Sequence, residues 1–380
     1  MGNAVRLALF GVGGIGARHL EIAEQESQCR IVAVADPMEA AGVAAGRHRA
    51  RFYRDYRELL ARESLDGAIV ATPNDRHAEV GMACAERGLP VLMEKPITDT
   101  LASGRALLDS VAAQGVTLAV GHHRRFDPAI AIARDAIEGG RIGTLVAVEC
   151  LWAVRKHDAY YDADWRRIRP GGGPALINLI HDVDLLRHLC GDVARVYAEG
   201  GSRLRGHEVE DTVAVTLRFM NGAVGTILAS DAAPSPWGWE LGTGENPLIP
   251  PTGRNCYRFL GTEGALALPR LELWRHDAGV VPNWHEAIHA RILAAGPRAA
   301  LKEQLRHFCA VVRAEHAPRV SGEDGLQTLR TTLAIVEAMD RGSPIALEGS
   351  EDDAAPGCAT RFSPTAAGGR RSPRVRRPDS

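Results

Sequence analysis

The chain has 380 residues, of which 45% are hydrophobic and 24% are charged. It is too long for one ordinary domain of roughly 100 to 200 residues, so we expect two domains, and its near-average composition argues against wholesale disorder, a collagen-like repeat or a coiled coil. The formal net charge of −2 provides no basic field that would attract nucleic acid or an anionic membrane, and no stretch approaches the roughly 18 apolar residues of a membrane helix.

The N-terminus and the cysteines indicate a cytoplasmic protein. The first residues do not form a secretory signal, and Arg6 stands where a myristoylation motif requires Ser or Thr. The seven cysteines are odd in number, widely spaced and free of any CxxC pair. We therefore expect reduced, buried thiols, with no disulfide and no cysteine-bound zinc.

Residues 1–121 alternate short strand-like runs with helical patterns. The strand-like runs are RLALF, RIVAVAD, GAIVATP, VLMEKP and VTLAVG, at 6–10, 30–36, 67–73, 91–96 and 116–121. Strands that alternate with helices are joined by parallel crossovers. The region therefore predicts an α/β fold, a Rossmann domain with a doubly wound parallel sheet.

The first turn of this domain carries a dinucleotide-binding signal. GVGGIG follows a strand and opens a helix, and its glycines have the GxGxxG spacing that lets a pyrophosphate approach the backbone. The candidate cofactor contacts in this turn are Gly11, Gly13, Gly14, Ile15 and Gly16. Asp36 ends the next strand, 20 residues after Gly16, where a carboxylate accepts hydrogen bonds from an adenosine ribose. We expect NAD, with NADP as the alternative because Arg47 and Arg49 follow.

Residues 122–345 show longer strand-like runs, which are typical of an α+β domain. Asn221-Gly222 separates two of these runs and predicts a β-hairpin. We expect a mostly antiparallel sheet with one open face. Helical patterns at 301–315 and 323–340 are expected to pack back on the first domain. The segment 346–380 has almost nothing to bury and is expected to be a disordered tail.

Lys95 stands out because only three of the 45 cationic residues are lysines. Burial and neighbouring charges shift the pKa of a lysine readily, and Lys95 ends a predicted strand of the nucleotide-binding sheet. Its scarcity alone leaves an ordinary surface role equally open. In alcohol oxidation a histidine is suited to accept the hydroxyl proton, and a lysine to stabilise the developing alkoxide.

The run VLMEKP at 91–96 resembles a signature of the Gfo/Idh/MocA oxidoreductases, the glucose-fructose oxidoreductase and inositol dehydrogenase family. The resemblance covers most of the chain, through ATPNDRHAEV at 71–80, VGHHRRFDP at 120–128, DWRR at 164–167 and GGGPALINLIHDVDLL at 171–186. It implies a Rossmann domain, a second domain with an open-faced sheet, and hydride exchange between NAD(P) and a sugar, cyclitol or similar hydroxyl compound.

The resemblance also implies roles for individual residues. Lys95 matches the lysine that holds the reacting hydroxyl and the nicotinamide ribose, and His181 matches the acid/base. Other positions that match cofactor contacts are Thr72, Pro73, Asn74, His77, Glu94, Trp165 and Arg166.

Position 177 departs from this pattern. Inositol dehydrogenases carry an Asp four residues before the catalytic His, whereas this chain has Ile177. A carboxylate one helical turn away would raise the pKa of the imidazole. Either His181 works with a lower pKa, or the base lies elsewhere, with Asp182 and Tyr161 as the nearest substitutes. Asn178 can orient the ring but supplies no charge.

The substrate pocket is expected at the carboxyl end of the last Rossmann strand. His122 and His123 follow the last Rossmann strand at its carboxyl end, where ligands bind in open α/β sheets, and we expect one of them to line the pocket. The run Gly171–Gly173 indicates a close backbone approach just before the His181 helix. The candidate substrate contacts are His122, His123, Tyr161, Asn178 and Asp182.

Three alternatives compete with this interpretation. His285, Glu286 and His289 fit HExxH, which on a helix binds zinc and supplies a Glu base, but no third-ligand pattern follows. A zinc hydrolase is therefore the remote alternative. The nearer ones are an NAD-dependent glycosidase of the same family and an NAD-binding protein that lost catalysis through Ile177.

The sequence thus predicts an enzyme, an NAD(P)-dependent dehydrogenase or reductase that prefers NAD and acts on a sugar, cyclitol or related small polyol. No metal, nucleic-acid partner or membrane partner is expected. The open sheet face predicts a homo-oligomer, a dimer or a tetramer.

Overall fold

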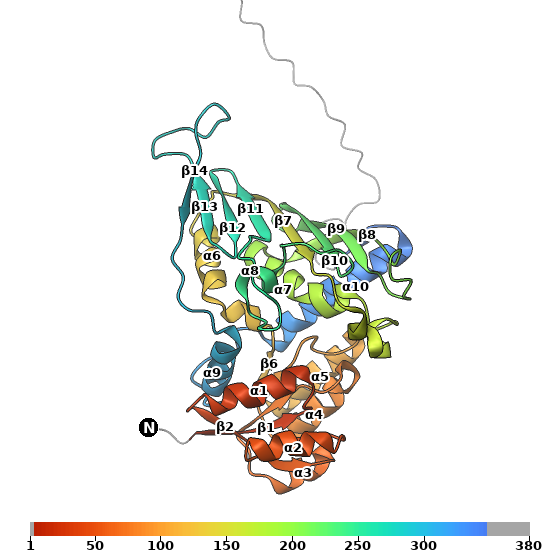
Figure 1. Cartoon of the computed structure of the whole chain (residues 1–380). Coiled ribbons are helices and arrows are strands. Elements are labelled where there is room, and N and C mark those ends of the chain that lie inside the picture. Colours follow the sequence, from red (N-terminus) through yellow and green to blue (C-terminus); the bar gives the residue numbers. More distant parts are fainter. Residues whose placement is uncertain (1–3, 348–380) are drawn as a thin grey trace, which may run out of the picture.

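A computed structural model describes residues 4–347, with an N-terminal parallel sheet beside a larger second sheet (Figure 1). The first sheet has the strand order β3-β2-β1-β4-β5-β6, and all its strands are parallel. Its strands are β1 (Val5–Phe10), β2 (Cys29–Ala35), β3 (Arg51–Tyr53), β4 (Gly67–Val70), β5 (Val91–Met93) and β6 (Leu118–Val120). Its helices are α1 (Gly14–Glu24), α2 (Ala40–Arg47), α3 (Tyr56–Arg62), α4 (His77–Glu86) and α5 (Leu101–Gln114).

This sheet is the predicted Rossmann domain. Strands β4 and β5 are buried at every residue because helices cover both faces, as in other all-parallel sheets. The strand order reverses between β1 and β4, and ligands of open α/β sheets bind outside such a switch point. The carboxyl ends of β1, β4 and β5 lead into the glycine turn, the Thr72 loop and Lys95.

The second sheet has nine strands in the order β14-β13-β12-β11-β7-β10-β9-β8-β15. Among the described strands of this second sheet, β7 and β10 form the only parallel pair, and all other neighbouring strands are antiparallel. The strands are β7 (Leu145–Ala153), β8 (Val193–Gly201), β9 (Thr212–Phe219), β10 (Val224–Ser230), β11 (Tyr257–Gly261), β12 (Gly264–Leu268), β13 (Glu272–Arg275), β14 (His289–Ile292) and β15 (Ile345–Ala346). The helices of this half are α6 (Pro128–Glu138), α7 (Ile180–Cys190), α8 (Trp239–Thr243), α9 (Ala300–Val312) and α10 (Gly322–Arg341).

The predicted open face is confirmed. Alternate residues of β9 and β10 are buried and exposed, so one face packs on α6, α7 and α10. No helix of residues 4–347 covers the other face (Figure 1). The Asn221-Gly222 turn joins β9 and β10, and Gly222 has the positive φ of 88° that favours glycine. The predicted hairpin is therefore confirmed as well.

The two late helices pack against the Rossmann domain. Leu305 and Phe308 of α9 join the core on the α1 side of the parallel sheet. Leu326 and Leu329 of α10 join the core on the other side, while Ile335 of the same helix packs under the second sheet. Helix α10 thus ties the two domains together.

The C-terminal boundary differs slightly from the expectation. The second domain reaches at least Leu347, because β15 pairs with β8 and the Leu347 amide donates to the Ala194 carbonyl at 2.9 Å. The expected disordered tail otherwise lies outside the described residues.

The cysteines and the helices of residues 4–347 can be compared with the predictions about thiols and membrane spans. The six cysteines in this range are all free and buried, as predicted, and Cys358 lies outside the described residues. No helix within 4–347 combines the length and apolar character needed to cross a bilayer.

The HExxH segment is not helical. Residues 285–288 lie in the exposed loop between β13 and β14, and His289 begins β14. Because the two imidazoles do not share a helix face, the geometry that would bind zinc is missing. No group of three or more potential metal-binding side chains gathers anywhere in the described residues. The helical HExxH geometry on which the zinc alternative depends is therefore absent from the described residues.

Candidate active site

The glycine turn between β1 and α1 has a closed side and an open side. A Cβ at Gly11 would lie 2.4 Å from the Ala71 carbonyl oxygen, and one at Gly16 would lie 2.1 Å from the Gly11 carbonyl oxygen. At Gly13 and Gly14 a Cβ would meet no atom within 4 Å, and no side chain caps the start of α1. The first turn of α1 therefore presents backbone amides to open space, as a phosphate site requires.

Asp36 lies against this turn. Its Oδ2 accepts a hydrogen bond from the Val12 amide at 2.8 Å, and its Oδ1 accepts one from the Met38 amide at 2.8 Å. Each oxygen keeps a lone pair for a ribose hydroxyl. Arg47 and Arg49 line a hollow with Glu24, at the opposite end of α1 from the glycine turn. The arrangement fits a ribose at Asp36, and Asp36 does not line the hollow that contains the two arginines.

The loop after β4 contains an unpaired hydroxyl. The Oγ1 atom of Thr72 is buried and has no hydrogen-bond partner in the described chain. An unsatisfied buried group costs about 1–3 kcal/mol, which marks it as a position that a ligand can satisfy. Pro73 and Asn74 follow, at the start of a short 3-10 helix, and remain partly or fully exposed.

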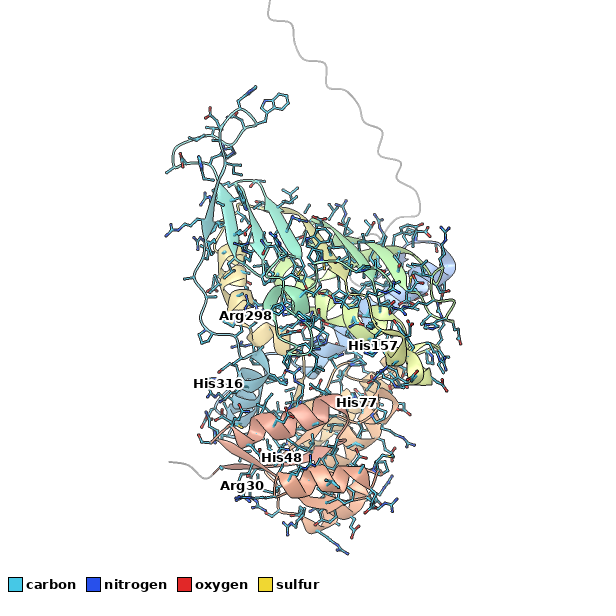
Figure 2. The ribbon with its side chains drawn as sticks, viewed as in Figure 1. Arg30, His48, His77, His157, Arg298 and His316 are labelled. Atoms are coloured by element: carbon cyan, nitrogen blue, oxygen red, sulfur yellow. The ribbon has the colours of Figure 1, made fainter. Side chains whose placement is uncertain are left out.

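His77 connects two loops instead of facing open space. It lies at the upper edge of the N-terminal domain, next to the second domain (Figure 2). Its Nδ1 is 2.8 Å from the Pro96 carbonyl oxygen and its Nε2 is 2.9 Å from the Thr72 carbonyl oxygen. Both ring nitrogens are occupied, so His77 holds the Thr72 loop in place, and its predicted contact with the cofactor stays a prediction.

Glu94 is also used inside the protein. Its Oε1 lies 2.8 Å from Nε2 of His19, and both side chains are almost completely buried. Burial works to raise the pKa of Glu94, but the hydrogen bond and charge of His19, with the charges of His123 and Lys95, outweigh it and leave the pKa below its ordinary value. Glu94 is therefore a buried anion beside Lys95, and its predicted contact with the cofactor stays a prediction.

Lys95 crosses the domain boundary. It follows β5, the Lys95-Pro96 bond is cis, and its Nζ donates a hydrogen bond of 3.3 Å to the Ile177 carbonyl oxygen in the second domain. Burial lowers the pKa of Lys95, and the charge of Arg124 lowers it further, although Glu94 and other carboxylates oppose this. The ammonium has a neutral oxygen as its partner, so it remains able to take a negative one.

The segment that receives Lys95 is a π-helical turn, Ala175–Leu179, directly before α7. Ile177, Asn178 and His181 stay partly exposed here, whereas Leu179 and Ile180 between them are buried. Single π turns are found mostly at functional sites. The turn brings Ile177 to Lys95 and leaves His181 one turn further on.

His181 lies among cations and other imidazoles. Its ring centroid is 5.3 Å from that of His123 and 6.3 Å from that of His122. Burial lowers the pKa of His181 well below its ordinary value, and the charges of Lys95 and Arg124 lower it further. The imidazole is therefore neutral near pH 7 and can accept a proton.

The two candidate pocket histidines differ in position. His122 is 1% exposed, neither ring nitrogen has a hydrogen-bond partner among the described residues, and burial lowers its pKa to about 4. His123 is partly exposed, packs on His181, and has its Nε2 3.5 Å from Glu245. Of the two, His123 is the one placed to line a pocket.

The two suggested substitutes for the missing acid are occupied elsewhere. Asp182 is buried under the second sheet, where Tyr257 donates a hydrogen bond to it and Arg124 lies 3.4 Å away. Burial raises its pKa to about 7. Tyr161 is buried and donates a hydrogen bond to Asp231. Both side chains are thus engaged within the second domain, and their roles as substitutes for the missing acid stay predictions.

Trp165 and Arg166 lie on the loop after β7. Trp165 is half exposed, and the Arg166 guanidinium stacks 5.3 Å from its ring and 4.1 Å from the ring of Tyr160. In the nearby glycine run a Cβ at Gly171 would meet no atom within 4 Å, whereas Gly172 and Gly173 approach protein closely. A Cβ at Gly172 would lie 2.6 Å from the Ile168 carbonyl oxygen, and one at Gly173 would lie 2.6 Å from Glu210.

Two cations near this site were not predicted. Arg124 is buried and binds three carboxylates, with its Nη2 2.7 Å from Glu240 and its Nε 3.0 Å from Glu245, besides the contact to Asp182. Lys156 places its Nζ 2.6 Å from Oδ1 of Asn178. The sequence shows Lys156 as one of its three lysines, but only the fold brings it to the π turn.

Comparison with known families gives two matches. A model described as an oxidoreductase family with an NAD-binding Rossmann fold matches residues 5–122, and one described as a GFO/IDH/MocA C-terminal domain matches residues 130–267. The N-terminal domain is therefore an NAD-binding Rossmann domain.

Similar proteins share both domains. The chain is 26% identical over 367 residues to scyllo-inositol 2-dehydrogenase (NAD(+)) of Bacillus subtilis, covering 92% of this chain and 98% of the relative. It is 31% identical over 295 residues to 1,5-anhydro-D-fructose reductase of Ensifer adhaerens, covering 77% and 82%. Among solved structures, the WlbA dehydrogenase from Bordetella pertussis, in complex with NADH and UDP-GlcNAcA, is 26% identical with a TM-score of 0.73, covering 90% of this chain and 99% of that one.

Proposed function

We propose that this chain, which belongs to the Gfo/Idh/MocA family of oxidoreductases, transfers hydride between NAD and a hydroxyl or carbonyl group of a sugar, cyclitol or related polyol. The observation that carries the proposal is the meeting of Lys95 and His181 at the domain boundary. The two side chains come from different domains, Lys95 reaches the Ile177 carbonyl at 3.3 Å, and its charge contributes to the low pKa of His181. NADP is the alternative cofactor.

The residues divide the work of alcohol oxidation between them. His181 accepts the hydroxyl proton, because its imidazole is neutral near pH 7. The Lys95 ammonium donates a hydrogen bond to the same oxygen and stabilises the negative charge that develops on it. A bound NAD supplies the hydride acceptor. In the reverse direction His181 returns the proton to the carbonyl oxygen.

Cofactor binding is assigned to the Rossmann domain. The open amides of Gly13 and Gly14 would hold the pyrophosphate, Asp36 the adenosine ribose, and the unpaired hydroxyl of Thr72 a further polar group. The names of the inositol dehydrogenase and the anhydrofructose reductase support a ring compound with several hydroxyl groups as the substrate.

A substrate screen combined with a lysine variant tests the proposal. Purified protein is assayed for NAD reduction with polyols, sugars and cyclitols, and the affinity for NADH is measured by fluorescence. Lys95→Ala should abolish turnover and leave NADH affinity within about threefold. Lys302→Ala is the matched control, because Lys302 lies on α9 and its Nζ donates to the Gln25 carbonyl oxygen at 3.1 Å. Equal loss of turnover and of NADH binding in Lys95→Ala would mean that Lys95 is structural.

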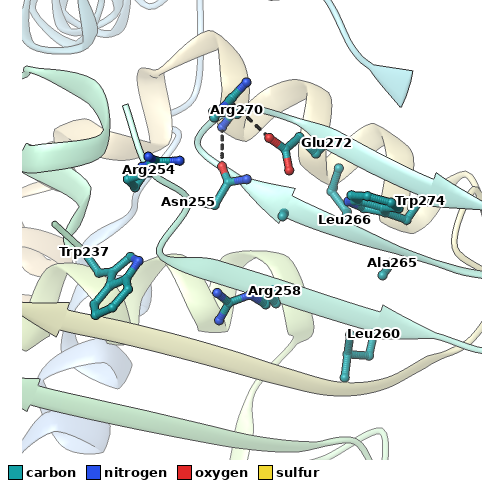
Figure 3. Close-up of a pocket in the computed structure, with 11 residues that line it drawn as sticks. Trp237, Arg254, Asn255, Arg258, Leu260, Ala265, Leu266, Arg270, Glu272 and Trp274 are labelled. Carbon is teal, nitrogen blue, oxygen red and sulfur yellow. Dashed lines mark hydrogen bonds and ion pairs between the residues drawn. The ribbon is translucent and has the colours of Figure 1, made fainter. Parts of the chain in front are cut away.

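We further propose a homo-oligomer that covers the open face of the second sheet. Apolar side chains stand exposed on four of its strands: Val146, Leu228, Leu260 and Trp274 are between 37% and 51% exposed. Leu260 and Trp274 also line a hollow on this face with Trp237 and Arg258 (Figure 3). A second copy of the sheet is the partner of matching shape, and light scattering should report a dimer or tetramer. Leu260→Asp should shift it toward monomer, whereas Leu204→Asp, on a loop outside the sheet, should not.

The cysteines support the cytoplasm as the working compartment. Six of the seven are described, and all six are buried and unpaired, as suits a reducing environment. Thiol titration of the unfolded protein without reductant should find about seven free thiols per chain.

A further inference from the structure

Lys156 carries a positive charge that no carboxylate of the described chain neutralises. Lys156 lies three residues after the end of β7, and its Nζ lies 2.6 Å from the amide oxygen of Asn178. The ammonium also lies 4.2 Å from the centroid of the Tyr160 ring and 5.7 Å from that of Trp152. None of the ion pairs within residues 4–347 includes Lys156.

A second cation shares the same aromatic ring. The Arg166 guanidinium lies 4.1 Å from the Tyr160 centroid, and its Nη1 donates to the Tyr160 carbonyl oxygen at 2.6 Å. Its Nε is buried and has no hydrogen-bond partner in the described residues. Like Lys156, Arg166 has only neutral oxygen and ring partners.

The nearest carboxylates are already committed. Asp231 accepts hydrogen bonds from Tyr161 and, at 3.1 Å, from Arg205. Glu240 accepts one from Arg124 at 2.7 Å and one from Trp152 at 3.0 Å. Burial lowers the pKa of Lys156 to about 8, although the charges of Asp231 and Glu240 oppose this. The ammonium is therefore still charged at pH 7 and lacks an anion.

This unpaired charge lies beside the proposed reaction site. Lys156 binds the side chain of Asn178, and Lys95 binds the carbonyl of Ile177, so two ammonium groups flank two consecutive residues of one π turn. His157, the next residue after Lys156, lies at the edge of the second domain that faces the N-terminal domain (Figure 2). The residue at the centre of the turn, Ile177, is apolar, so it supplies no carboxylate to either ammonium.

We propose that Lys156, flanked by Arg166, binds an anionic oxygen group of the substrate, so that the substrate is an acidic sugar and not a neutral polyol. The group is a carboxylate, as in a uronate, or a phosphate ester. An ammonium with free N–H groups beside a guanidinium gives charge-assisted hydrogen bonds to either. The inference rests on the proposed function, because it names the substrate class of that same site.

Matched pairs of sugars separate this inference from the proposed function. D-glucuronate, D-glucose 6-phosphate and D-glucose, with the corresponding galacto and manno compounds, are compared by NAD reduction and by calorimetric binding to the NADH-loaded protein. We expect kcat/KM to be about 10- to 100-fold higher for an acidic sugar than for its neutral parent. The better of the carboxylate and the phosphate identifies the anionic group.

Variants at Lys156 assign the preference to this residue. Lys156→Met should weaken binding of the acidic sugar by about 10- to 100-fold and change the neutral parent by less than about twofold. Lys156→Arg should restore most of the preference, and Lys302→Met is the matched lysine control. The melting temperature of each variant shows whether it is folded. Unchanged NADH affinity in Lys156→Met would show that the anion belongs to the substrate and not to the cofactor.

The outcomes are distinct. Turnover of neutral sugars with no advantage for the acidic ones, or equal effects of Lys156→Met on both, overturns the inference and leaves the proposed function intact. Loss of NADH affinity in Lys156→Met also overturns it. Binding of an acidic sugar that depends on Lys156, without NAD reduction, supports the anion site and contradicts the proposed function. Binding of no sugar overturns both.

The pH dependence offers a second readout. Raising the pH above about 8 removes the charge of Lys156, so KM should rise for the acidic sugar and stay level for the neutral one. A rise that is the same for both would contradict the assignment. The polar and charged groups that face the ammonium are Asn178, Tyr160, Arg166, Arg205, Asp231 and Glu240.

Discussion

Replacing Ile177 with Asp tests whether His181 moves the proton. The native pKa of His181 lies well below its ordinary value of 6.5, because of burial and the charges of Lys95 and Arg124. The kcat/KM for alcohol oxidation should therefore rise with pH through that low pKa and be level near neutrality. Ile177 is partly exposed, its carbonyl receives Lys95, and it lies four residues before His181.

The expected shift follows from the separation of the two side chains. Side chains one helical turn apart have Cβ atoms about 5–6 Å from each other. At about 6 Å, with an effective dielectric constant of about 20 to 40, a carboxylate and an imidazolium attract by about 1.4 to 2.8 kcal/mol. This attraction raises the pKa of the imidazole by about one to two units. The acid limb of kcat/KM should move to higher pH by the same amount.

The assay is the pH profile of kcat/KM for the best substrate of the screen. Three proteins are compared: the native enzyme, Ile177→Asp, and Ile177→Asn, which has nearly the same shape as Asp without the charge. NADH affinity at each pH serves as the reference, because it should not follow the shift. An acid limb that stays in place in Ile177→Asp, or moves equally in Ile177→Asn, would refute the assignment of His181 as the base.

The other predictions concern the cofactor site. Gly16→Ala forces a methyl to within 2.1 Å of the Gly11 carbonyl oxygen and should lower the free energy of unfolding, measured in urea, by at least about 1–3 kcal/mol. Gly13→Ala should stay stable and weaken NADH binding, because a Cβ at Gly13 meets no protein atom. A fully stable Gly16→Ala would contradict the packing. Asp36→Ala should shift the ratio of the NADPH and NADH dissociation constants toward NADPH by about tenfold or more, and an unchanged ratio would argue against the ribose contact. Thr72→Val removes an unpaired buried hydroxyl and should weaken NADH binding without loss of stability, so unchanged NADH affinity would leave that hydroxyl unexplained.

The Rossmann half was predictable because its signals are local. The turn that contains Gly11 and Gly16 needs glycine for steric reasons that act within a few residues, and the structure shows both contacts. Asp36 could be placed because it ends the adjacent strand. The Asn221-Gly222 hairpin depended on the same kind of short-range constraint.

Predictions that depended on distant contacts succeeded less often. A glycine run shows that the backbone approaches another group closely, and at Gly173 that group is the Glu210 carboxylate, which lies 37 residues further along the chain. The HExxH pattern predicts a zinc site only when it lies on a helix. Here His289 belongs to β14, which pairs with β13, so the segment is not helical. Asp182 was expected at the site, yet the first turns of α7 direct it under the sheet to Tyr257. The amino-acid types at 175–179 also do not predict the π turn that precedes α7.

The partners of the cations explain why this arginine-rich chain keeps lysine at the site. Arg124 binds three carboxylates and Arg125 contacts Asp184 and Asp324, so these permanent charges are neutralised and hold the junction of the two domains. A substrate oxygen could recruit such a guanidinium only by breaking a buried ion pair, which costs several kcal/mol. Within the described residues, Lys95 and Lys156 donate hydrogen bonds to neutral oxygens, and Lys156 also lies over two aromatic rings. Each can therefore bind a negative oxygen without displacing a carboxylate, and the chemistry of the site depends on that difference.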